Sequence, residues 1–211
     1  MPALALAQLP PYGGASNSSG SGNSSSSSSS SSSRKASPYF SLALKGIKGA
    51  AGSDDNKYAI GRDLFMYGGE ALLGIRQKNW LLAVSGEFNH WVQRTKPAEV
   101  YDTNMAGNQV NVAPALGLSF GRFILIGKLY AYSKMRLEKE DIAGNEIAYV
   151  APSVESFAVQ LNMRLAGSTF IGVEYGQVTY KKLQRDGKEE ALSSDQRIKY
   201  GGWGVLYGLK F

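Results

Sequence analysis

GWGVLYGLKF, the stretch from Gly202 to Phe211, sets large apolar side chains against small or polar ones at every second position. Trp203, Tyr207 and Phe211 share one parity, and glycines with a lysine occupy most positions of the other. Alternation with a period of two is typical of a β-strand, because successive side chains of a strand point to opposite faces. The stretch therefore predicts a strand with one strongly apolar face.

The same alternation recurs in seven earlier segments. In each, one face carries large apolar or aromatic residues, and the other carries Gly, Ala and Ser with scattered Lys and Glu. The segments span approximately residues 39–45, 65–75, 80–89, 109–120, 123–134, 156–163 and 171–176. In the fifth segment, the side chains expected on the second face are Lys128, Tyr130, Tyr132 and Lys134. The sequence thus predicts an all-β domain of eight strands.

Short and long connections alternate between these segments. Short turns are expected at 77–79, 121–122 and 166–168, and long polar loops at about 49–62, 92–107, 136–147 and 181–195. Transmembrane β-barrels of bacterial outer membranes have short periplasmic turns and longer external loops. The pattern therefore predicts an antiparallel up-and-down transmembrane β-barrel in an outer membrane, with both termini on the periplasmic side.

A soluble barrel of the lipocalin type is the alternative fold, but it would carry its apolar side chains inside. Here the face of small and charged residues suits a narrow interior, and the apolar face suits lipid. No apolar run approaches the roughly 20 residues of a membrane helix, so any span must consist of strands. Aromatic residues near the strand ends are expected to form an interfacial girdle. These residues include Phe40, Trp80, Phe123 and Phe211.

The first 36 residues are predicted to lie outside the barrel domain, which we place at 37–211. Residues 3–8 (ALALAQ) are similar to the end of a secretory signal peptide, with Ala5-Leu6-Ala7 in the small-x-small form of a cleavage site. Residues 16–33 consist of serine with a few Asn and Gly. Such a tract has no apolar side chains to offset its ordering entropy, so it is predicted to be a disordered linker.

The final strand resembles the C-terminal assembly signal of bacterial outer-membrane barrels, through Trp203, Tyr207, Leu209 and the terminal Phe211. With eight strands, residues 37–211 resemble in pattern the small barrels of the OmpA membrane-domain, OmpX and OmpW types. The resemblance implies outer-membrane lipids as the surroundings, contact with the barrel-insertion machinery during assembly, and a monomer.

Five charged side chains have inward parity and similar expected heights within the barrel. They are Lys45, Glu70, Glu87, Lys128 and Glu174. An eight-stranded barrel has just enough interior for side chains, and buried charges must be paired. The sequence therefore predicts a charge network that plugs the lumen, with an ion pathway as the alternative. Arg164 is expected lower in the lumen, where it would help to balance the three carboxylates.

Little in the sequence points to catalysis or to a cofactor. Lipid A-modifying barrels resemble one another in using a histidine with a nearby serine, but His90 has no serine two residues on, and Ser85 has the opposite parity. His90 is therefore interpreted as an interfacial residue. One histidine and no cysteine disfavour a metal site, and no phosphate-binding loop is present.

The formal net charge is +6, but the basic residues are interspersed with acidic residues along the chain, which disfavours nucleic acid as a partner. The leading hypothesis is a non-enzymatic envelope protein with a structural or surface-interaction role. The alternatives are a narrow channel or conduit for small molecules, and a lipid A-modifying enzyme.

Overall fold

A computed structural model describes residues 35–52, 64–93, 105–137 and 146–211. All regular structure in these ranges is β-strand. The strands are β1 (Ser37–Gly52), β2 (Leu64–Gln77), β3 (Trp80–Gln93), β4 (Met105–Phe120), β5 (Phe123–Leu129), β6 (Tyr132–Leu137), β7 (Ile147–Pro152), β8 (Phe157–Arg164), β9 (Thr169–Arg185), β10 (Lys188–Ala191) and β11 (Ile198–Lys210). Within the described ranges, no helix is long and apolar enough to cross a membrane.

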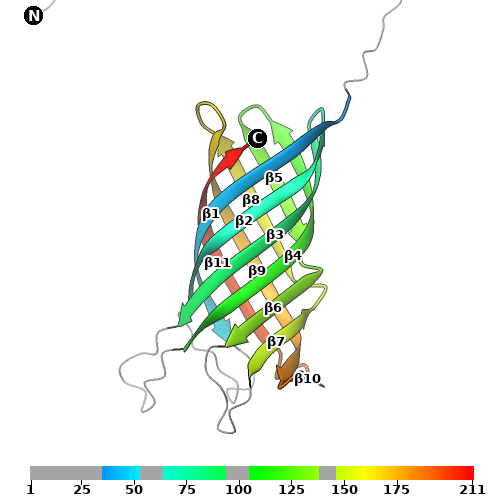
Figure 1. Ribbon diagram of the computed structural model, residues 1–211, viewed down its shortest axis with the longest axis vertical. Helices are drawn as coiled ribbons and strands as arrows, with labels where there is room; N and C mark the ends of the chain where they lie inside the picture. Colours follow the sequence, from blue (N-terminus) through cyan, green and yellow to red (C-terminus); the bar gives the residue numbers. More distant parts are fainter. Residues whose placement is uncertain (1–34, 53–63, 94–104, 138–145) are drawn as a thin grey trace, which may run out of the picture. The chain divides into compact units, whose positions relative to one another are not determined.

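The strands form one closed antiparallel barrel (Figure 1). β5 and β6 both pair with β4, so together they form one interrupted strand of the barrel wall. In the same way, β7 and β8 both pair with β9 and together form another interrupted strand. β11 pairs with β9 on one side and with β1 on the other, which closes the sheet. β10 pairs only with β9. The predicted fold class, an eight-stranded up-and-down transmembrane barrel, is confirmed.

The three tight turns lie at one end of the barrel, together with the start of β1 and with Phe211 (Figure 1). We call this the turn side, and the opposite end the loop side. Lys78, Gly121 and Gly167 adopt positive φ angles of 54°, 60° and 66° in these turns. Glycine takes this conformation without steric cost, whereas Lys78 accepts a modest strain so that β2 and β3 can reverse direction.

The outer surface of the barrel is apolar, as the alternation predicts. Leu44 is 72% exposed and Trp203 is 67% exposed, and many other large apolar side chains face the same way. Water would penalise so much apolar surface, whereas the acyl chains of a bilayer do not. Aromatic residues gather near the turn side, where Phe40 lies 5.6 Å from Phe211 between ring centroids and Phe120 lies 5.8 Å from Phe123.

One part of the predicted alternation is wrong. Tyr132 is exposed and Lys134 is partly exposed on the outer face, whereas Ser133 and Met135 are buried in the lumen. The cause is a β-bulge, because residues 129–131 lie opposite only residues 113–114 of β4. An extra residue in one strand inverts the faces of everything that follows it.

The predicted loop boundaries are also too generous on the loop side. β1 continues to Gly52 and β9 to Arg185, so parts of the expected loops 49–62 and 181–195 are strand. β9 and β10 form a hairpin whose turn contains Gly187 at a φ of 76°. β7 also lies within residues that the alternation left unassigned.

The signal-peptide remnant and the serine linker lie outside the described residues. They remain predictions, as does the boundary of the domain at residue 37.

Candidate functional site

Three layers of side chains fill the lumen. Toward the turn side lies an apolar cluster that includes Tyr39, Leu72 and Ile126. Toward the loop side lies a larger cluster that includes Trp91 and Met135. Between the two lies a buried polar layer, whose charged members are Lys45, Glu70, Glu87, Lys128 and Glu174.

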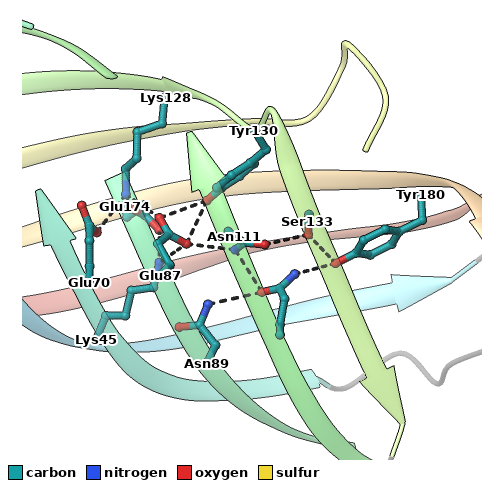
Figure 2. Close-up of polar contacts among 11 residues, drawn as sticks. Lys45, Glu70, Glu87, Asn89, Asn111, Lys128, Tyr130, Ser133, Glu174 and Tyr180 are labelled. Atoms are coloured by element: carbon teal, nitrogen blue, oxygen red, sulfur yellow. Dashed lines mark hydrogen bonds and ion pairs between the residues drawn. The ribbon is translucent and has the colours of Figure 1, made fainter. Parts of the chain in front are cut away.

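The structure brings these five side chains together in one network (Figure 2). Lys128 Nζ lies 2.9 Å from Glu70 Oε2, 2.9 Å from Glu87 Oε1 and 2.5 Å from Glu174 Oε2. Lys45 Nζ lies 2.7 Å from Glu87 Oε2 and 3.2 Å from Glu174 Oε1. Glu87 and Glu174 therefore each bridge both lysines.

Barrel closure is what creates this network. Glu70 and Glu87 face each other directly across the β2–β3 ladder, a placement that by itself is repulsive. Lys128 reaches both carboxylates from β5, and Lys45 and Glu174 come from β1 and β9. Each of these five strands supplies one charged residue to the network. The charges therefore become paired only when the strands surround a common lumen.

A hydrogen-bonded extension continues from the network toward the loop side (Figure 2). Asn111 Nδ2 donates to Glu87 Oε2 at 3.0 Å, and Ser133 Oγ donates to Asn111 Oδ1 at 2.6 Å. Tyr130 lies 3.3 Å from Glu87 Oε2 through its hydroxyl. The outer members of the extension are Gln109, Asn89 and Tyr180. Sequence parity marks several of these residues as inward, but it does not show that they extend the charge network.

The three carboxylates alone are close enough to hold a metal ion, with one oxygen of each within 4.8 Å of the others. The Lys128 ammonium, however, already contacts all three residues, and Lys45 contacts two of them. The lysines thus supply the positive charge that a metal ion would otherwise provide. With three acids and two bases, the set has one acid in excess, and buried Glu70 Oε1 has no hydrogen-bond partner among the described residues.

Arg164 does not perform the balancing role that its position suggests. It lies at the turn-side end of β8, and the ion pairs of the described residues do not include it. The excess acid of the network is therefore not matched by Arg164.

His90 lies on the outer face of β3, partly exposed, as its parity predicts. Its Nδ1 lies 3.1 Å from Asn108 Oδ1, and its ring centroid lies 5.1 Å from that of Tyr67. Ser85 is buried on the inner face of the same strand. The two side chains therefore lie on opposite faces of the barrel wall.

The residues of the predicted assembly signal all lie on the outer face of β11 or directly after it. Trp203, Tyr207, Leu209 and Phe211 are exposed. Trp203 contacts Tyr175 of the neighbouring β9, with ring centroids 4.9 Å apart. Their role in assembly remains a prediction.

The fold is that of the small eight-stranded outer-membrane barrels. Ail, the attachment invasion locus protein of Yersinia pestis, was solved alone and with the heparin analogue sucrose octasulfate. The complex has 15% sequence identity and a TM-score of 0.50 over 82% of this chain and 99% of Ail. Ail alone has 13% identity and a TM-score of 0.51 over 82% of this chain and 98% of Ail.

Neisserial surface protein A has 10% identity and a TM-score of 0.50, over 84% of this chain and 99% of its own. No protein-family model and no curated protein matches the chain. At these identities the similarity establishes the fold alone.

Proposed function

We propose that this protein is a non-enzymatic outer-membrane barrel with a closed lumen, and that it acts in the envelope through its loop-side surface. The mid-lumen ion-pair network carries the proposal. Side chains of its members are between 0% and 2% exposed, so bulk water does not reach them. A conducting pore of the same width would hydrate charged groups along its wall.

The apolar layers on either side of the network support closure. Trp91, Met66 and Met135 are fully buried on the loop side, and Leu72 and Ile126 are buried on the turn side. An ion would have to pass both apolar layers and also break the contacts of Lys128. Eight-stranded barrels of this width are generally filled by side chains.

The placement in the membrane rests on the apolar exterior and on the lengths of the connections. Short turns at one end and longer connections at the other match the periplasmic and external sides of outer-membrane barrels. This supports a periplasmic location for the start of β1 and for Phe211. The pairing of β1 with β11 closes the barrel wall without a free edge in its membrane-spanning part, which supports a monomer surrounded by outer-membrane lipids.

We propose the loop-side surface as the region through which the protein contacts other molecules on the external side. It includes the β9–β10 hairpin, where Lys182 Nζ lies 2.6 Å from Glu189 Oε2 at an exposed position. An enzymatic role receives less support, since His90 and Ser85 lie on opposite faces of the wall.

Two measurements test the proposal. Purified barrel is reconstituted in planar lipid bilayers, where we expect no steady conductance, and lipid A from expressing and non-expressing cells is compared by mass spectrometry, where we expect no difference. Steady wild-type conductance would establish the channel alternative. Any new lipid A species would contradict the non-enzymatic proposal. If that species is lost in a His90→Ala variant, His90 takes part in the reaction, and if it persists, His90 does not.

A further inference from the structure

The turn-side mouth of the barrel gathers three cations. Arg76 from β2, Arg164 from β8 and Lys210 from β11 lie near the turn-side ends of their strands, all partly buried. Lys210 Nζ lies 5.4 Å from the centroid of the Tyr39 ring, and Arg76 Nη2 donates to Ser119 Oγ at 2.8 Å. Arg164 and Lys210 line the same cavity at this mouth, where their positive charges repel each other.

No described carboxylate side chain neutralises this cluster. The ion pairs of the described residues leave out all three cations. The acidic residues of the described ranges lie in the mid-lumen network or toward the loop side, and they are Glu70, Glu87, Glu146, Glu155, Glu174, Asp186, Glu189, Glu190 and Asp195. The three like charges repel one another, and a bound anion would reduce this repulsion.

A cavity of about 370 Å³ opens at this mouth, within the size range of small-molecule sites. Arg164, Lys210, Asn162 and Ser168 are among its polar lining residues. Its apolar lining includes Tyr39, Ile124 and Phe170, which are buried. The cavity thus combines cationic and neutral donors on its wall with an apolar surface.

We propose that this vestibule binds a phosphoryl group, with Arg164 and Lys210 as its principal ligands and Arg76 as a neighbouring charge. Guanidinium groups bind phosphate through two parallel hydrogen bonds, and an ammonium group adds a point charge. Three positive charges are better matched by a phosphate monoester or inorganic phosphate than by a carboxylate with one negative charge. The remaining space and the apolar lining suit an organic group attached to the phosphate, either a soluble phosphorylated molecule or a lipid head group.

Full-length barrel in a nonionic detergent is titrated with inorganic phosphate, with chloride at equal ionic strength as the reference, and binding is followed by calorimetry and by the melting temperature. We expect phosphate to bind and to raise the melting temperature above the chloride reference. Arg164→Gln and Lys210→Gln should each weaken binding about tenfold, because each removes a charge-assisted contact. Arg122→Gln is the control, since Arg122 is exposed on a neighbouring turn and does not line the cavity.

The same variants also test, without added ligand, whether repulsion among the three cations lowers the stability of the barrel. In phosphate-free buffer of low ionic strength, Arg164→Gln and Lys210→Gln should melt at or above the wild-type temperature, because like-charge repulsion falls.

Two lipid experiments distinguish the sources of the phosphoryl group. Nanodiscs of phosphatidylcholine receive inorganic phosphate, and nanodiscs that contain phosphatidic acid receive none.

A response in the first arm alone identifies a soluble phosphorylated ligand, and a response in the second alone identifies a lipid head group. Stabilisation in either arm supports the proposal only if Arg164→Gln and Lys210→Gln reduce it and Arg122→Gln does not. If wild type and both variants respond equally, or if phosphate acts no differently from chloride, the vestibule is not a phosphate site. None of these results depends on whether the lumen conducts.

Discussion

Replacing Lys128 by methionine tests the central role of the mid-lumen network. Met keeps most of the length and the apolar stem of lysine but removes the ammonium that contacts Glu70, Glu87 and Glu174. Lys45 then remains as the only cation of the network facing three carboxylates, and it contacts only Glu87 and Glu174. Glu70 would lose the one ion pair that it makes among the described residues.

The expected loss of stability is about 3–5 kcal/mol, which is typical when one partner of a buried ion pair is removed. Lys128 is fully buried and has three carboxylate partners, which favours the upper part of that range, while water entering the lumen would lower it. Lys45→Met removes two contacts rather than three, so its effect should be smaller. Lys188→Met is the control because Lys188 is exposed on β10, where such substitutions change stability by about 0.5 kcal/mol or less.

Equilibrium unfolding by urea in detergent micelles, followed by tryptophan fluorescence, measures the three variants beside wild type. The double variant Lys128→Met/Glu70→Gln adds a further test, because removing the stranded Glu70 charge should restore part of the lost stability. Planar bilayers then report whether Lys128→Met conducts ions where the wild type does not. If Lys128→Met unfolds at the same urea concentration as Lys188→Met, the network does not hold the lumen together and the reasoning is wrong.

Four further predictions follow from other parts of the molecule. The barrel should require detergent or lipid and should shift its gel mobility on boiling, whereas a monodisperse monomer without detergent would contradict the transmembrane fold. Deleting Phe211 should reduce insertion in cells but barely affect refolding into detergent, and equal insertion would remove Phe211 from the assembly signal. Removing residues 16–33 should leave the melting temperature unchanged, and a large decrease would show that the tract packs against the barrel. Gly208→Ala should cost about 1–3 kcal/mol in urea unfolding, since its Cβ would lie 2.4 Å from Leu42 O and 2.5 Å from the Phe170 ring, whereas Gly127→Ala meets nothing within 4 Å and serves as the control.

The sequence predicts the barrel well because the signal repeats. One alternating segment is weak evidence, but eight of them separated by alternately short and long connections favour a single architecture. The boundaries on the loop side could not be predicted, because strands there leave the lipid. Lys182, Gln184 and Glu189 lie in paired strands that have no apolar outer face to mark them. Polar hairpins beyond the membrane resemble loops when only hydrophobicity is considered.

The inward parity of the five charged residues could also be read from the sequence, because a period of two is maintained from each turn to its charge. Their pairing could not be read, since it depends on the positions of side chains across the lumen. Glu70 and Glu87 are adjacent across one ladder, while Lys128 reaches both from β5. Arg164 illustrates the limit, because parity places it inside but height separates it from the carboxylates.

The bulge between β5 and β6 decides which side chains of this barrel strand enter the lumen. Its position cannot be predicted from the alternation of the sequence alone. Tyr130 within the bulge points inward to Glu87, and Ser133 after it also points inward, to Asn111 and Tyr180. A regular strand would place Ser133 in the lipid and Tyr132 in the lumen. The extra residue therefore directs Ser133, and not Tyr132, into the hydrogen-bonded layer. Beyond it, the same shift directs Met135 and Leu137 into the apolar cluster on the loop side, so a single change of register links the charge network to the layer that covers it.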